Sequence, residues 1–182
     1  MKHYIRAVVR DKNGKVIKDT GYKRVNTITR WFYALLATDM AQEARWQITF
    51  ENGTTGTLGY DSRNFGAAAG EGDTGRHIVV GTGTADPTRL DHALEAKIAH
   101  GTGSGQLYYG VGSFDIGDDY IELRRTFTNN SGADITINEI GILVYAYDAD
   151  AGTLKRALIA RSLYTITVPD GGSVTLYYRI SG

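Results

Sequence analysis

Cysteine is absent from this chain of 182 residues, and proline occurs only twice. The absence of cysteine excludes disulfides, thiolate catalysis and cysteine-ligated zinc. No run approaches the roughly 18 apolar residues of a membrane-spanning helix, and the N-terminal segment M-K-H-Y-I-R-A-V-V-R lacks the apolar core of a signal peptide. We therefore expect one domain, residues 1–182, without a covalent staple and without a membrane partner.

An excess of one charge is also missing, because 20 Lys and Arg face 20 Asp and Glu for a formal net charge of zero. A nucleic-acid-binding protein needs a basic stripe, since neutralising phosphates supplies much of its affinity. The sequence has no such block, so no nucleic-acid partner is expected. A net charge near zero favours a protein held in an assembly over a highly soluble free monomer.

Glycine and tyrosine are abundant, at 23 and 12 residues. The clearest structural pattern of the sequence lies in the segment Tyr120–Ile180. Runs rich in β-branched and aromatic residues alternate there with turns that combine Gly with Asn, Asp or Ser. Within the runs, apolar residues such as Ile121, Leu123 and Phe127 alternate with polar ones, so one face of each strand seeks a core. This pattern predicts a mainly β protein, an antiparallel, jelly-roll-like β-sandwich whose C-terminal third is a stack of hairpins.

The first half of the chain adds hairpins at Asn13-Gly14 and Asn52-Gly53 and one amphipathic α-helix near residues 27–40. Asn26 or Thr27 can cap this helix. Its apolar stripe follows spacings of three and four and consists of Ile28, Trp31, Phe32, Leu35 and Leu36. We expect the stripe to cover the sheet, with docking of Trp31 and Phe32 into a neighbouring subunit as the alternative.

The middle of the chain is less regular. Asp61–Gly75 has no periodicity and is predicted to be a long exposed loop. His77–Val80 reads as a short buried strand, and Ala85–Ile98 as one or two helical turns or an irregular anchored loop.

The motifs for catalysis and ligand binding are incomplete. V-V-G-T-G-T and G-T-G-S-G lack the remaining residues of a phosphate-binding loop and are explained as turns. The four histidines have no metal-ligand spacing, the acids of Asp115–Asp119 and Asp148–Asp150 suit turns as well as calcium, and no G-x-S-x-G occurs. No catalytic residue, cofactor or metal is therefore expected.

The arginines of the predicted strands are the most informative charged residues. They could line an outward face and pair with carboxylates of another chain, or form a solvated face with local ion pairs. The residues in question are Arg124, Arg125, Arg156, Arg161 and Arg179.

Two stretches bear a resemblance to structural proteins of tailed bacteriophages. I-V-V-G-T-G-T-A-D-P-T-R-L-D-H-A-L-E-A-K-I (Ile78–Ile98) resembles one recurring segment of these proteins. R-T-F-T-N-N-S-G-A-D-I-T-I-N-E-I-G-I (Arg125–Ile142), with the later L-I-A-R-S and V-T-L-Y-Y-R-I, is similar to another. The resemblance implies a virion component with a jelly-roll-like sandwich, a bend or close backbone approach at Glu139–Gly141, and a pairing of Arg161 with Glu139.

The leading hypothesis is a non-enzymatic virion structural protein, a capsid cement or decoration protein that bridges capsid subunits after assembly in the host cytoplasm. Its expected partners are copies of itself, with a trimer as one option, and other virion proteins, but no small-molecule substrate. The candidate contact residues are Trp31, Arg124, Arg125 and Arg161.

Other roles stay open. A neck, tail or baseplate position is the alternative within the same class. A carbohydrate-binding module is the alternative from another class, with Tyr108, Tyr109, Tyr177 and Tyr178 as stacking platforms. A glycosidase is a third option that needs two carboxylates in one cleft, for which Glu122 and Glu139 lie on predicted strands.

Overall fold

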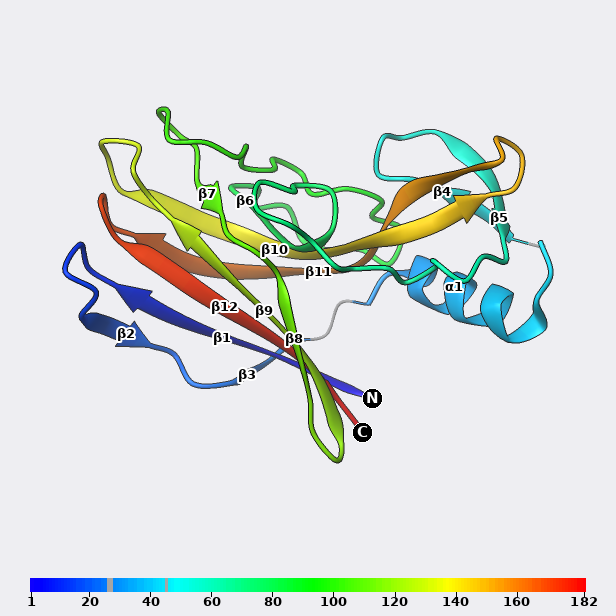
Figure 1. Ribbon diagram of the computed structural model, residues 1–182, viewed down its shortest axis with the longest axis horizontal. Coiled ribbons are helices and arrows are strands. Elements are labelled where there is room, and N and C mark those ends of the chain that lie inside the picture. The colour runs from blue at the N-terminus through cyan, green and yellow to red at the C-terminus, as the bar shows by residue number, and fades with distance from the viewer. Residues whose placement is uncertain (26–27, 45) are drawn as a thin grey trace.

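The described residues form two antiparallel sheets and one α-helix, which confirms the predicted β-sandwich (Figure 1). The computed structural model describes residues 1–25, 28–44 and 46–182. The seven-stranded sheet contains β1 (Lys2–Arg10), β2 (Val16–Asp19), β3 (Lys23–Val25), β7 (Tyr108–Tyr109), β8 (Ser113–Ile116), β9 (Tyr120–Thr128) and β12 (Ser173–Ser181). The five-stranded sheet contains β4 (Trp46–Thr49), β5 (Thr55–Gly59), β6 (His77–Gly81), β10 (Ile135–Asp148) and β11 (Thr153–Val168).

The long strands β10 and β11 run the length of the molecule. One half of this pair packs on the seven-stranded sheet, and the other half carries β4, β5 and the helix (Figure 1). The core between the sheets is aliphatic and aromatic, as the alternation of the strands requires. Its largest fully buried apolar side chains include Tyr109, Tyr178, Phe50, Phe127 and Leu107.

Of the C-terminal strands, only β10 and β11 form a hairpin with each other. β9 instead pairs with β12 in the other sheet, with Tyr120 opposite Ser181. The predicted stack of hairpins is therefore wrong, because the chain changes sheet after β9 and again after β11. The two crossing turns hold each other: Asn129 N donates to Gly172 O at 2.9 Å, and Gly171 N donates to Asn129 O at 2.8 Å.

The helix α1 spans Arg30–Ala41 and begins later than predicted. The proposed caps at residues 26 and 27 lie outside the described residues, and the N-cap is Thr29. The Thr29 hydroxyl does not cap the helix but donates to Leu158 O of β11 at 2.6 Å. Trp31 and Leu35 are buried against the sheet, so packing holds this helix in place.

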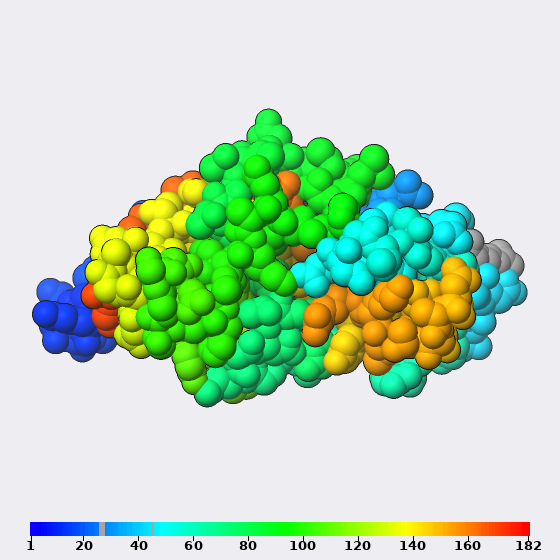
Figure 2. All heavy atoms as spheres, turned by 90° about the horizontal axis from the view of Figure 1, so that it is seen from above, coloured from blue at the N-terminus to red at the C-terminus, as the bar shows by residue number. Residues whose placement is uncertain are grey.

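The irregular segments pack against the rest of the protein and do not extend into solvent. Residues 61–75 lack regular structure as predicted, but Asn64, Ala67, Ala69 and Gly75 are buried, so this loop is anchored along its length. The segment 82–107 forms no helix and is the irregular anchored alternative. Together with its neighbours it covers much of the face seen from above (Figure 2).

Candidate interaction surface

The solvent side of the seven-stranded sheet carries rows of tyrosine and arginine. We call this surface the outer face and define it by Tyr4, Arg6, Arg124, Tyr177 and Arg179. Strand register places Tyr4 opposite Arg179, Arg6 opposite Tyr177, and Tyr177 opposite Arg124. Tyrosine and arginine therefore alternate across β1, β12 and β9, a composition enriched at the energetic centres of protein interfaces.

Neighbouring contacts fix the orientation of most outer-face side chains. The Arg179 guanidinium lies 4.0 Å from the ring centroid of Tyr120 and 4.2 Å from that of Tyr22, and its Nε is 2.9 Å from Glu122 Oε2. Arg6 lies 5.4 Å from the Tyr177 ring and pairs with Asp19. The hydrogen bond from Arg6 lowers the pKa of Asp19 to about 2. Preordered side chains lose less conformational entropy when a partner binds.

Arg124 differs from the other outer-face arginines. It is exposed, its Nε donates to Ser113 Oγ at 3.2 Å, and no carboxylate of the described residues forms an ion pair with it. A guanidinium presents several donors in a planar fork that suits carboxylates and backbone carbonyls. Arg124 is thus the outer-face side chain with the most unused hydrogen-bonding capacity.

Arg125, the residue after Arg124 in β9, points into the protein and is 1% exposed. Its guanidinium donates to four backbone carbonyls: Gly110 O at 2.8 Å, Arg76 O at 3.1 Å, Ile78 O at 3.2 Å and Gly70 O at 3.2 Å. Burial lowers its pKa. Arg125 therefore fastens the loop before β6 and the segment after β7 to the inner side of β9.

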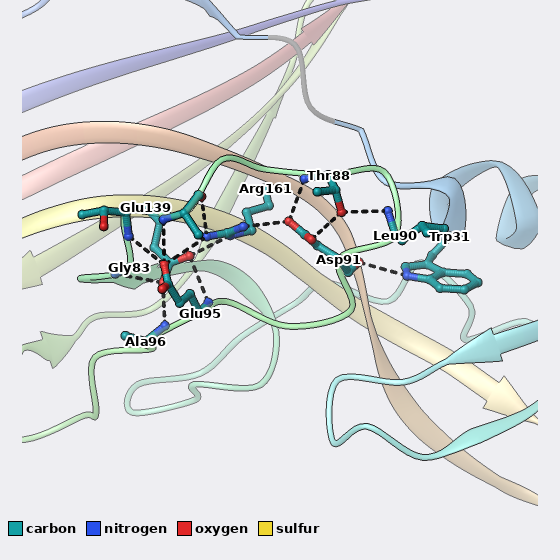
Figure 3. Close-up of polar contacts among 11 residues, drawn as sticks. Trp31, Gly83, Thr88, Leu90, Asp91, Glu95, Ala96, Glu139 and Arg161 are labelled. Atoms are coloured by element: carbon teal, nitrogen blue, oxygen red, sulfur yellow. Dashed lines mark hydrogen bonds and ion pairs between the residues drawn. The ribbon is translucent and has the colours of Figure 1, made fainter.

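Arg161 is also buried, at 3% exposure, and lies in a network with Glu139 and Asp91 (Figure 3). Its Nε is 2.8 Å from Glu139 Oε2 of β10, and its Nη1 is 2.7 Å from Asp91 Oδ2 of the segment 82–107. Burial opposes the charge on Arg161, but the hydrogen bonds to Asp91 and Glu139 outweigh burial and raise the pKa of Arg161. The pairing of Arg161 with Glu139 that the resemblance implied is present.

The Glu139 carboxylate completes this Arg161 network by binding backbone amides. It accepts from Ala96 N at 2.8 Å, Glu95 N at 3.1 Å and Gly83 N at 3.2 Å (Figure 3). A Cβ added at Gly81 or Gly83 would lie 2.4 or 2.5 Å from Glu139 Oε1. The G-T-G sequence at the end of β6 therefore contributes the Gly83 amide to an anion cradle whose other two amides come from Glu95 and Ala96, and the anion is a carboxylate of the chain itself.

The Arg161 network also positions the helix. Trp31 Nε1 donates to Asp91 O at 3.0 Å, and Arg30 N donates to Arg89 O at 2.8 Å. Trp31 is 5% exposed, so its indole serves this internal contact. The four predicted contact residues therefore separate into two groups: Trp31, Arg125 and Arg161 are buried within the chain, and Arg124 alone is exposed. Of the five strand arginines, Arg125 and Arg161 therefore do not lie on an outward face. Arg124 and Arg156 are exposed, and Arg179 is half-buried and pairs with Glu122.

The other predicted sites are also resolved. Tyr109 and Tyr178 are buried, which leaves Tyr108 and Tyr177 as the partly exposed members of the proposed sugar platform. Glu122 and Glu139 lie in different sheets, and each is paired with an arginine. Asp148 accepts the turn amides of Asp150 and Ala151 and pairs with Lys155 at 2.6 Å, and Asp150 accepts the Thr57 amide of β5 at 2.7 Å. Within 1–25, 28–44 and 46–182, no three His, Asp or Glu side chains are grouped as a metal site.

Sequence reasoning missed Arg6, Tyr22 and Tyr120 as members of the outer-face contacts. Strict alternation in β1, where Tyr4 and Arg6 flank the buried Ile5, could have found Arg6. Comparison of the chain with protein families, curated proteins and solved structures gives no match. None of the described helices is long and apolar enough to span a membrane.

Proposed function

We propose that the chain is a non-enzymatic structural protein of a tailed-bacteriophage virion, a capsid cement or decoration protein that bridges capsid subunits. The outer face is the observation that carries this proposal. It is a broad sheet surface of alternating tyrosine and arginine, already ordered by ion pairs and ring contacts, and Arg124 is open to a carboxylate or carbonyl of a partner. Such a surface suits a protein partner.

The resemblance to phage structural proteins supplies the virion context. Its two segments meet in space. Gly83 N of the first segment donates to Glu139 of the second, and Asp91 of the first pairs with Arg161, which also pairs with Glu139. The two resembling segments are thus joined by direct contacts, which supports the interpretation that they form one structural feature shared with the phage proteins. The proposed partners are copies of the chain, as a trimer or another homo-oligomer, and other virion proteins. A neck, tail or baseplate position remains the alternative site on the virion.

Immunogold electron microscopy of purified virions from cells that carry the gene tests this proposal. We expect label at regular positions on the capsid of intact particles, and label at the neck, tail or baseplate would support the alternative position. Virions without label, together with saturable oligosaccharide binding by an isolated monomer, would overturn the proposal in favour of a carbohydrate-binding module.

A further inference from the structure

The two edges of the seven-stranded sheet carry opposite charges. At one edge, β2 and the turn before it carry three exposed lysines, Lys12, Lys15 and Lys18, and exposed Val16 and Ile17 (42% and 53%). None of these lysines has an ion-pair or hydrogen-bond partner through its side chain among the described residues. We call these five residues the basic edge.

The other edge is formed by β8 and its turn to β9. It carries exposed Asp115, Asp118 and Asp119 together with Phe114 and Ile116, which are 48% and 78% exposed. Asp115 accepts only the neighbouring Ile116 amide at 3.0 Å, and the three carboxylates form no ion pair in the part of the chain that the structure describes. We call these five residues the acidic edge.

Each edge also ends the sheet. β2 pairs with β1, β8 pairs with β9, and the described residues place no strand on the far side of either. An unpaired strand with exposed apolar side chains is a template for another chain, and like charges along it normally prevent such pairing. Here lysines repel a second basic edge and aspartates repel a second acidic edge, whereas unlike edges attract each other.

We propose that the basic edge of one copy docks on the acidic edge of the next copy, so that the chain assembles head to tail. This inference rests on the proposed function only in taking the chain to act as a homo-oligomer. The contact would bury Val16 and Ile17 against Phe114 and Ile116, and the lysines would neutralise the aspartates. Because the two edges are different surfaces, the contact is heterologous and produces a ring when the rotation closes or a filament when it does not.

The sheet topology fixes the relative position of successive copies. β1 and β9 run in the same direction, since both are antiparallel to β12, and therefore β2 and β8 also run in one direction. β2 lies beside the end of β1 at Val8–Arg10, whereas β8 lies beside the beginning of β9. Copies related by a translation, or by a rotation about an axis along the strands, would place β2 and β8 parallel and be staggered along the strands. In Figure 1 the two elements protrude at different corners of the sheet.

Charge reversal tests the inference with two variants. The first, Lys12→Glu/Lys15→Glu/Lys18→Glu, makes both edges acidic, and the second, Asp115→Lys/Asp118→Lys/Asp119→Lys, makes both edges basic. We expect wild type to sediment as an oligomer in low salt and more weakly in high salt, because surface charges are screened. Each variant alone should sediment as a monomer. An equal mixture should regain association as alternating copies, since each variant then meets only unlike edges.

Controls separate this result from misfolding and from total charge. The circular dichroism spectrum and melting curve of each variant should match wild type, because among the described residues the substituted side chains form no hydrogen bond or ion pair with another element. Asp86→Lys reverses an exposed carboxylate outside both edges and should leave the oligomer mass unchanged. The inference is overturned if wild type is a monomer throughout, if either variant keeps the wild-type mass, or if the mixture stays monomeric. Labelling of virions would be unaffected by that outcome, so the proposed function can stand or fall independently.

Discussion

At the scale of single residues, the protein places charge inside the fold and satisfies it with backbone groups. The carboxylate of Glu139 binds one guanidinium and three amides, and the guanidinium of Arg125 binds four carbonyls. Hydrogen bonds that involve an ion are stronger than neutral ones, but a buried ion left alone is costly. Removing either side chain should therefore lower the stability of the fold, mainly because its buried partners would be left without a hydrogen bond.

Glu139→Ala tests that statement. The substitution leaves Arg161 with one fewer carboxylate and leaves the amides of Gly83, Glu95 and Ala96 without an acceptor. We expect the free energy of unfolding in urea to fall by about 3–5 kcal/mol, the usual cost of breaking a buried pair. Glu139→Gln, which keeps an acceptor, should lose less. A loss below about 1 kcal/mol for Glu139→Ala would show that the network is not structural.

Gly83→Ala tests the close approach of the backbone to the same carboxylate. The added Cβ would lie 2.5 Å from both Glu139 Oε1 and Glu95 Cβ, so the segment must shift. We expect a loss of about 1–3 kcal/mol, which is typical of overpacking. Gly70→Ala is the matched control, because its Cβ would meet nothing within 4 Å and its φ is not positive. Equal melting temperatures for the two variants would contradict the cradle.

His77 predicts a dependence of stability on pH. Burial lowers the pKa of His77 to about 4, and the pKa of His3 is likewise lowered to about 4, first by burial and then by the N-terminal charge. An unfolded histidine titrates near 6.5, so between about pH 6.5 and 4 the unfolded state binds protons that the folded state does not. The stability that these histidines contribute is present above pH 6.5 and is lost as pH falls toward 4.

The measurement is urea unfolding at pH 7 and pH 5, combined with an NMR titration of the imidazole groups. The slope should be at most about 1.4 kcal/mol per pH unit for each histidine. The His77 ring should stay neutral down to pH 5, with its Nε2 hydrogen-bonded to Ser113 O at 3.1 Å. A midpoint near 6.5 for His77 would contradict its burial.

At the scale of elements, the segment 82–98 and helix α1 depend on contacts with β10 and β11. The segment is held by Glu139 and Arg161, and the helix by Trp31, Leu35 and the Thr29 hydroxyl. The helix has no acidic residue in its first turn and no basic residue in its last turn. Both elements should therefore loosen before the strands when these contacts are weakened.

Hydrogen exchange of Glu139→Gln tests this dependence. The amides of Gly83, Glu95 and Ala96 should exchange faster than in wild type, and those at the beginning of α1 should follow, since Arg30 N bonds to Arg89 O. The amides of β12, which lies in the other sheet, should be unchanged and serve as the internal control. Uniformly faster exchange would mean that the substitution lowers global stability without a local effect.

Periodicity and turn residues predicted most elements, but they could not predict pairing. Alternation assigned an inward face to β9, yet the partner of β9 proved to be β12, because the pattern of one strand carries no information about its neighbour. Ile121 follows the inward pattern but is exposed, since the β8–β9 hairpin extends past the second sheet.

The buried arginines were likewise predicted only in part, because their partners lie in distant segments of the chain. Arg125 sits at an inward position that polarity assigned to solvent, and only the converging carbonyls explain its place there. The pairing of Arg161 with Glu139 came from the resemblance, whereas Asp91 as a further partner comes from a distant segment. Long-range polar networks of this kind leave no periodic signal in the sequence.

At the scale of the whole molecule, the interior and the surface have separate roles. The charges of the Arg161 network and Arg125 hold segments of the chain together, whereas the outer face and the two sheet edges leave charges and apolar side chains in solvent. A net charge of zero with such exposed groups favours association over a dispersed monomer.

Sedimentation velocity of the wild-type chain over a wide range of concentrations tests this account most directly. We predict a sedimentation coefficient that rises with concentration to that of a defined assembly and falls again when salt is added. A single monomeric species at every concentration and in every salt would contradict the claim that the basic and acidic edges bind other copies of the chain.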